Sequence, residues 1–253
     1  MSDNNSIIDG RLIHPFNCII SGPTGSGKTT FLLNLLLYTR NVISIEKFDY
    51  IIIFSGSELF SLAETKRKLT QIREIYPETL LKVINLDEEY QSKSELADNL
   101  SLEFLQQFMI PGKCGCIVFD DLMSELTDAG LLVPLFTKIS SHNNISFVLI
   151  TQNLFHRTSG KHASDHVTLY RNTHYLVLFQ NPLDNSVFQN VARRLSSTSA
   201  KIKYLTDLLQ FITNKYRYVL IDGKLQTPHE IRFRTDIFNR QPVAYQRVFT
   251  TTE

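Results

Sequence analysis

Residues 16–38 have the sequence FNCIISGPTGSGKTTFLLNLLLY, and this stretch decides the fold of the chain. A short apolar run, 18–20, leads into a glycine-rich segment, and an amphipathic run, 29–38, follows it. Gly22 together with the triplet 27–29 completes the pattern G-x-x-x-x-G-K-[ST]. The order of strand, glycine-rich loop and helix is that of a phosphate-binding loop.

The loop predicts a site for ATP and Mg²⁺. Glycines let the backbone N–H groups wrap a phosphate, and the helix N-terminus adds partial positive charge. Lys28 is expected to contact the β- and γ-phosphates, Thr29 to place its hydroxyl on Mg²⁺, and Thr30 to bond the α-phosphate. The residues expected to contact the nucleotide are Gly22, Pro23, Thr24, Gly25, Ser26, Gly27, Lys28, Thr29 and Thr30. The purely structural alternative is a glycine-rich turn whose lysine reaches into solvent.

Length and composition indicate a single large α/β domain. The chain has 253 residues, of which 43% are hydrophobic and 20% charged, as in ordinary globular proteins. We expect a loose lead-in over residues 1–13 and one P-loop ATPase domain over 14–253. The three cysteines have no metal-ligand spacing and fit a reducing compartment. No apolar run is long enough to span a bilayer, so we expect no membrane partner.

The net charge of +1 gives no argument for a polyanionic partner. It does not exclude one, because a few lysines in a narrow groove suffice to bind a nucleic acid.

Residues 116–121, Cys-Ile-Val-Phe-Asp-Asp, predict the second half of the nucleotide site. Four apolar residues indicate a buried central strand whose carboxyl end brings Asp120 beside the phosphate loop, where it can hold Mg²⁺. Asp121 then faces the γ-phosphate and can accept a proton from the attacking water or orient it. The alternative is a strand that ends in an Asp-Asp turn or helix cap.

Residues 146–151 predict another buried strand, which ends at Gln152. An amide at the carboxyl end of a parallel strand lies where α/β sheets place groups that touch ligands. Gln152 can therefore orient the attacking water at the γ-phosphate, with simple turn chemistry as the alternative.

The remaining pattern predicts further strands over 50–55, 175–179 and 216–222, the last closed by a hairpin-type turn at Asp222-Gly223. Residues 231–235 alternate apolar and basic side chains, which is typical of an edge strand. A helix is expected over 61–76. We interpret its basic residues as a solvated face, with a nucleic-acid contact as the alternative; they are Lys66, Arg67, Lys68 and Arg73.

The phosphate loop, Phe-Asp-Asp-Leu-Met at 119–123 and Thr-Gln-Asn-Leu-Phe at 151–155 together resemble viral genome-packaging ATPases of the FtsK–HerA superfamily. The similarity is greatest to the short packaging ATPases of Polinton (Maverick) elements, adintoviruses and virophages, with the poxvirus packaging ATPase a more distant relative. It spans residues 14–235. The resemblance implies a RecA-like core with a mainly parallel sheet flanked by helices.

The same resemblance implies a homo-oligomeric ring that pulls double-stranded DNA into a capsid, with capsid or portal proteins as partners. The expected location is the cytoplasm or nucleus of the infected host cell, with the virion as an alternative.

Two catalytic groups are implied outside these motifs. Packaging ATPases carry an arginine near an asparagine before the strand at 175–179, so Arg171 resembles their arginine finger, with Arg157 as second choice. Bacterial superfamily members have Asp-Glu where this chain has two aspartates. RecA-like folds sometimes take the carboxylate from a neighbouring strand, so Glu58 is a rival to Asp121 as the base.

Two other classes of function share the phosphate loop. A small-molecule or nucleoside kinase needs an arginine-bearing lid and a second-substrate pocket, and gives Gln152 no role. A nucleotide-dependent switch module binds ATP but needs no pair of groups to orient water. The presence of both Asp121 and Gln152 therefore favours an ATPase.

Overall fold

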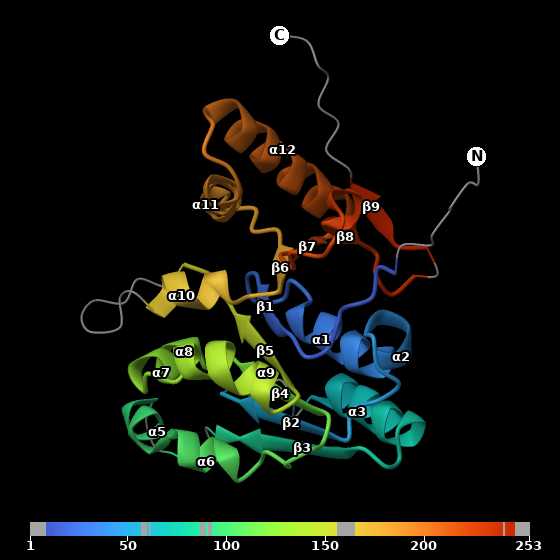
Figure 1. Cartoon of the computed structure of the whole chain (residues 1–253), viewed down its shortest axis with the longest axis vertical. Helices are drawn as coiled ribbons and strands as arrows, with labels where there is room; N and C mark the ends of the chain where they lie inside the picture. Colours follow the sequence, from blue (N-terminus) through green and yellow to red (C-terminus); the bar gives the residue numbers. More distant parts are fainter. Residues whose placement is uncertain are drawn as a thin grey trace.

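The computed structural model describes residues 9–56, 60, 62–86, 90, 93–155, 165–239 and 241–245. They form one nine-stranded sheet with the order β3-β2-β4-β5-β1-β6-β7-β8-β9 (Figure 1). The pairs that join β3 through β6 are parallel, and those that join β6 through β9 are antiparallel. The strands are β1 (Asn17–Ser21), β2 (Tyr50–Ser55), β3 (Leu80–Asn85), β4 (Gly115–Asp120), β5 (Ile145–Thr151), β6 (Tyr175–Phe179), β7 (Tyr218–Asp222), β8 (Phe233–Thr235) and β9 (Val243–Tyr245).

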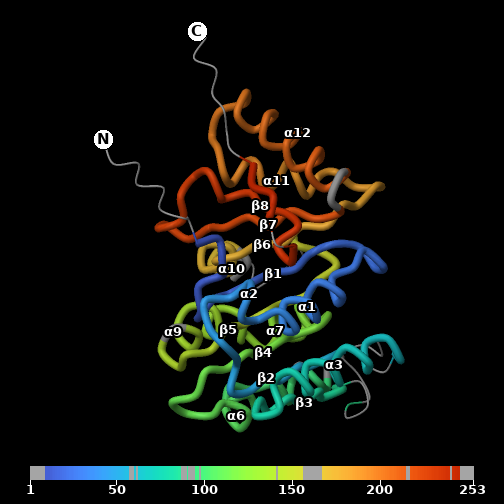
Figure 2. Tube along the Cα trace, turned by 90° about the vertical axis from the view of Figure 1, so that its right-hand side faces the viewer, coloured from blue at the N-terminus to red at the C-terminus, as the bar shows by residue number. Residues whose placement is uncertain are grey.

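Helices cover both faces of this sheet, and each face has its own apolar core. One face is covered by α1 (Lys28–Leu37), α2 (Thr39–Val42) and α3 (Ala63–Ile75). The other is covered by α5 (Lys93–Asn99), α6 (Leu102–Gln106), α7 (Met123–Asp128), α8 (Leu132–Pro134), a π-helical turn (Leu135–Ile139), α9 (Ser140–His142), α10 (Asp165–Arg171), α11 (Ser186–Leu195) and α12 (Ser199–Tyr216). A short 3-10 turn, His229–Ile231, precedes β8. Figure 2 shows α11 and α12 at the opposite end of the molecule from α3 and α6.

The central strands are apolar along their whole length because both of their faces are covered. Every residue of β1, β2, β4 and β5 is buried, as expected for parallel strands between two helical layers. In β3, at the sheet edge, exposed and buried residues alternate in its first half. This burial confirms the predicted strands at the phosphate loop, the Asp-Asp motif and Gln152.

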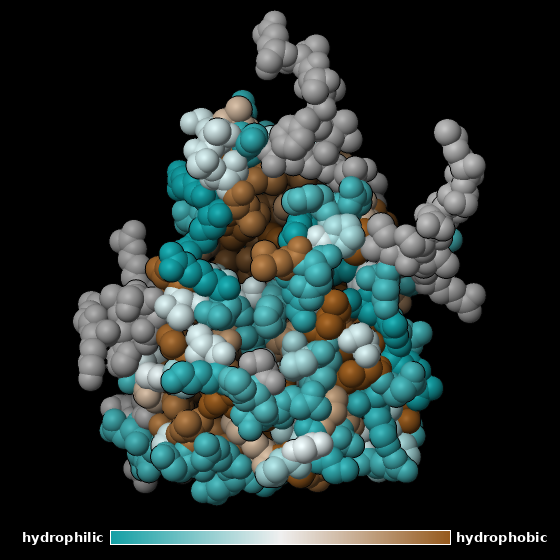
Figure 3. All heavy atoms as spheres, viewed as in Figure 1, coloured by the Kyte–Doolittle hydropathy of each residue, from teal (hydrophilic) through white to brown (hydrophobic). Residues whose placement is uncertain are grey.

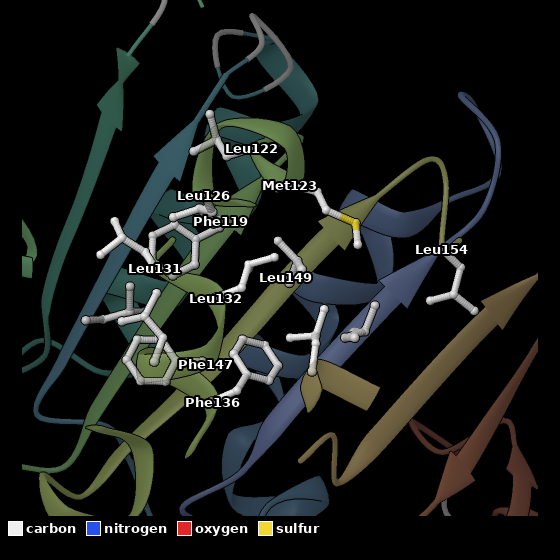
Figure 4. Close-up of a cluster of buried hydrophobic side chains, with 14 of the residues drawn as sticks. Phe119, Leu122, Met123, Leu126, Leu131, Leu132, Phe136, Phe147, Leu149 and Leu154 are labelled. Carbon is white, nitrogen blue, oxygen red and sulfur yellow. The ribbon is translucent and has the colours of Figure 1, made fainter. Parts of the chain in front are cut away.

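Aromatic rings fill the core under α7 and α8 (Figure 4). Phe54, Phe119, Phe147 and Phe136 stack in series, with centroid separations of 5.6, 6.2 and 6.4 Å. Leu126 and other aliphatic side chains from α7 and α8 pack on these rings. The stack fixes β2, β4 and β5 relative to one another, and these strands deliver the polar residues of the nucleotide site.

Two sequence-based expectations about the far end of the sheet are wrong. Strand β8 is not an edge strand, because β9 pairs with its outer side and all three residues of β8 are buried. Asp222-Gly223 does not form a tight hairpin, because a ten-residue connection separates β7 from β8. Arg234 instead donates to Asp222 Oδ2 at 2.7 Å as a buried ion pair and also bonds the carbonyl of Gly10.

The described part of the amino-terminal segment is attached to the body of the molecule. Leu12 is 1% exposed and forms a bridge with Ile43. In the described part of the chain, no helix combines the length and the apolar character needed to cross a bilayer.

Candidate functional site: a nucleotide pocket at the carboxyl edge of the sheet

The phosphate loop connects the end of β1 to the start of α1. Gly25 and Gly27 have φ angles of 76° and 105°, in the left-handed region that favours glycine. Gly22 has another reason to be glycine, because a Cβ there would lie 2.5 Å from Phe179 Cβ. The loop is joined to β5 by a hydrogen bond from the Gly22 N–H to the Thr151 carbonyl, at 3.3 Å.

Lys28, the first residue of α1, is held over the loop. Its Nζ donates to the carbonyls of Gly22 and Pro23 at 2.7 and 2.8 Å. Burial lowers the pKa of the Lys28 ammonium, and the negative charges of Asp120 and Asp121 oppose that shift. The lysine thus faces both aspartates of the motif at 116–121.

Asp120 is the last residue of β4 and is only 2% exposed. The Ser55 hydroxyl, from the end of neighbouring β2, donates to Asp120 Oδ2 at 3.4 Å. Thr29, in the first turn of α1, lines the same cavity. Mg²⁺ in nucleotide sites is held by one or two carboxylates together with phosphates and waters, so one buried carboxylate and one hydroxyl fit this ion.

Asp121 lies just beyond the strand in an unusual backbone conformation, with φ of 58°. Its Oδ2 accepts a hydrogen bond from Gln152 Nε2 at 3.2 Å. Gln152 Oε1 in turn accepts one from Thr24 Oγ1 at 3.1 Å. Gln152 therefore links the phosphate loop to Asp121 across the ends of β1, β5 and β4, and Asp121 and Gln152 lie close enough to act on one water molecule.

A cavity of about 410 Å³ joins these groups at the carboxyl ends of the parallel strands. It is lined by Thr24, Gly25, Gly27, Lys28, Thr29, Thr30, Leu33, Leu62, Glu64, Thr65, Lys68, Asp120, Asp121, Ile150 and Gln152. This is the edge at which open α/β sheets bind ligands.

The structure does not bring Arg171 into this cavity. Strand β6 runs parallel to β1 with Tyr175 opposite Cys18, so a residue before Tyr175 lies at the amino edge, whereas the phosphate loop follows the carboxyl edge. Arg171 is exposed at the end of α10 and lines a second cavity of about 440 Å³ instead. Figure 3 shows an apolar hollow in this part of the molecule, below α11 and α12. Glu58 and Arg157 lie outside the described residues.

The wall that α3 adds to the nucleotide cavity is not predicted by the sequence patterns. Leu62, Glu64, Thr65 and Lys68 line it, whereas the sequence predicts a solvated face for Lys68, with a nucleic-acid contact as the alternative. One signal was present in the sequence. These residues follow soon after the strand at 50–55, which pairs with the strand that ends at Asp120.

Comparison with known protein families identifies the family of the chain. The family model of the Poxvirus A32 protein matches residues 8–173, which include the loop, both aspartates, Gln152 and Arg171. The chain belongs to the Poxvirus A32 protein family. Membership confirms the resemblance to the poxvirus packaging ATPase and places the chain among P-loop ATPases.

No curated protein matches the chain in sequence, and two solved structures are similar to it at low identity. The genome packaging NTPase B204 of Sulfolobus turreted icosahedral virus 2, solved with ATP-gammaS, is similar with 13% identity and a TM-score of 0.43, over 84% of this chain and 94% of that one. The KaiC-like protein PH0186 of Pyrococcus horikoshii OT3 is similar with 13% identity and a TM-score of 0.44, over 92% and 90% of the two chains. The RecA-like assignment therefore rests on the sheet, the phosphate loop and the family.

Proposed function

We propose that this member of the A32 family is an ATP-hydrolysing translocase that packages double-stranded DNA into a viral capsid. The observation that carries the proposal is the hydrogen-bonded series Thr24, Gln152 and Asp121 beside the phosphate loop. A site that only binds nucleotide needs no carboxylate and amide fixed together opposite the phosphates. The same pair gives a hydrolase its means of orienting water and accepting its proton.

Each residue has its own role at the γ-phosphate in this proposal. Lys28 and the loop amides stabilise the negative charge that develops in the transition state. Thr29 and Asp120 would hold Mg²⁺, which would neutralise negative charge on the β- and γ-phosphates. Gln152 orients the water, and the Asp121 carboxylate accepts its proton.

A neighbouring subunit completes this site in our proposal. Among the described residues that line the cavity the cations are Lys28 and Lys68, and none is an arginine. Arg171 lies at the opposite edge of its own sheet, so it can act only on the site of another copy. An arginine supplied in this way contributes about 10³ to 10⁵ in rate. This requirement supports a homo-oligomeric ring, whose function in packaging implies DNA and capsid or portal proteins as partners inside the infected cell.

The experiment that tests the function is ATP turnover with and without linear double-stranded DNA, with Lys28→Ala as the inactive control. A translocase releases phosphate faster when DNA is present. A nucleoside kinase transfers phosphate to an added nucleoside, and DNA does not change its rate. A switch module binds ATP without multiple turnovers. Either of the last two results would refute the proposal.

A further inference from the structure

Asn17 is the first residue of β1, and only 1% of its surface is exposed. A polar side chain so deeply buried normally has hydrogen-bond partners. Asn17 Nδ2 donates to the Phe136 carbonyl at 2.7 Å and to the Asn172 carbonyl at 2.9 Å. One amide group therefore joins three segments that are far apart in the sequence.

The Phe136 carbonyl gives this amide a rigid attachment. Phe136 is buried in the π-helical turn, and its ring lies against Phe147 at the end of the aromatic stack (Figure 4). Close-packed side chains in a protein core resist displacement. The Asn17 amide is therefore fixed on the side that faces the core.

The Asn172 carbonyl belongs to the residue that directly follows α10. Arg171 is exposed at the last position of that helix. A helix of seven residues is too short to be stable alone, so its position depends on contacts with the rest of the molecule. The backbone of Asn17 adds two such contacts, because its carbonyl accepts from the His174 N–H at 2.9 Å and its N–H donates to His174 Nδ1 at 3.0 Å. Asn17 thus holds the chain directly after Arg171.

The oxygen of the same amide argues against a purely structural role. Asn17 Oδ1 is buried and has no hydrogen-bond partner among the residues that the structure describes. A buried acceptor without a partner lowers stability, so stability alone does not favour asparagine at this position. The two bonds made by Nδ2 are what the position gains from this residue.

We infer that Asn17 is a positioning residue for Arg171: its amide fixes the backbone from which this arginine extends toward the nucleotide site of another copy. The inference rests on the proposed function, in which Arg171 acts in trans. A displacement of about 1 Å in such a group can cost about 10² in rate. An exposed side chain at the end of a short helix is placed that accurately only if the end of the helix is held.

The two ends of β1 then serve different nucleotide sites. The carboxyl end leads into the phosphate loop of its own site, and this end is held separately, by pairing with β5 and β6 and by the Gly22 bond to the Thr151 carbonyl. The amino end carries Asn17, whose side chain bonds the segment after Arg171. Loss of the amide should therefore leave its own loop in place and impair the site of the neighbouring subunit.

Subunit mixing tests the inference, because it separates a defect in a subunit's own site from a defect in the arginine that it supplies. Asn17→Leu keeps a side chain of similar size and removes both Nδ2 bonds. Alone, it should bind ATP within about threefold of wild type and turn it over about 100-fold more slowly. Mixed with Lys28→Ala subunits, which supply a correctly placed Arg171, it should regain at least about a tenth of wild-type turnover. Mixed with Arg171→Ala subunits it should stay inactive, since neither subunit then supplies the arginine.

Cys18→Ala is the matched control. Cys18 is the next residue of β1 and is fully buried, but its side chain packs in the core on the other face of the sheet, beneath α1. It should keep turnover within about threefold of wild type and should not respond to mixing. Asn17→Ala, which leaves a smaller side chain, replaces Asn17→Leu if the leucine variant does not fold.

Three results would overturn the inference. If Arg171→Ala subunits rescued Asn17→Leu, or if neither partner did, Asn17 would act on its own nucleotide site. Turnover near wild type in Asn17→Leu alone would show that the amide does not position the arginine. Unfolding of both Asn17→Leu and Asn17→Ala would make the residue purely structural. Failure of Lys28→Ala to rescue Arg171→Ala would instead refute the action of Arg171 in trans, which belongs to the proposed function.

Discussion

Asp121→Asn should remove hydrolysis while leaving the nucleotide site intact. Asp121 has φ of 58°, and asparagine is among the few residues that tolerate this left-handed region. The asparagine side-chain oxygen can still accept the hydrogen bond that Gln152 Nε2 now donates to Asp121. The substitution therefore removes the negative charge and the proton acceptor, and little else.

The size of the effect follows from the role assigned to Asp121. A positioned general base contributes about 10² to 10⁴ in rate, or roughly 2.7 to 5.4 kcal/mol of activation free energy. ATP affinity should stay within about threefold of wild type, since a group that acts only in the transition state changes kcat and kcat/KM together. Asp121→Ala should also destabilise the folded protein, because alanine at this φ adds about 1 kcal/mol of backbone strain.

The assay is single-turnover hydrolysis of bound ATP, with affinity measured separately by calorimetry. Asp120→Asn is the matched comparison, and it should lose Mg²⁺-dependent binding because it replaces the buried carboxylate that we propose as the Mg²⁺ ligand. Turnover by Asp121→Asn within about threefold of wild type would show that Asp121 is not the base. A larger loss in Glu58→Gln or Glu64→Gln would assign the base to that glutamate instead.

Three further perturbations have defined outcomes. Gly22→Ala should abolish ATP binding while far-UV circular dichroism stays unchanged, because the new Cβ would lie 2.5 Å from Phe179 Cβ; retained affinity would contradict this. Burial lowers the pKa of His14, so its contribution to stability is complete above the unfolded pKa of about 6.5 and is lost as the pH falls below it. Urea unfolding at pH 7 and 5.5 should show a drop that is smaller in His14→Gln, and an equal drop would exclude His14. Mixing Arg171→Ala with Lys28→Ala subunits should restore ATP turnover if the arginine acts in trans, and no rescue in mixed, DNA-bound oligomers would argue against it.

The parts of the site that the sequence predicted are those encoded by short, contiguous patterns. The loop at 22–30 and the strands that lead to Asp120 and Gln152 can be predicted from local spacing alone. An apolar run followed by polar residues marks the end of a buried strand. The structure then places these three segments together, because their strands are parallel and close in the sheet order.

The parts that the sequence did not predict depend on neighbours distant in the chain. Lys68 Nζ donates a hydrogen bond to Asn34 Oδ1, which requires α1 and α3 to lie side by side. Helical periodicity alone does not predict which face of α3 packs against α1. The left-handed backbone at Asp121 has no signature in a pair of aspartates. Strand β8 is covered by residues 243–245, whose short pattern gave no strand signal.

The position of β1 between β5 and β6 controls when the phosphate loop can form during synthesis. The loop emerges early from the ribosome, but Ile19 pairs with Leu149 on one side and Leu176 on the other. Pairings of such long sequence separation form slowly, and until they form, an apolar strand with two free edges is exposed to aggregation. Strand β6 follows all the nucleotide motifs in the chain, and it supplies Phe179 against Gly22. A nascent chain that ends before β6 therefore carries these motifs and still lacks the strand on which the loop rests.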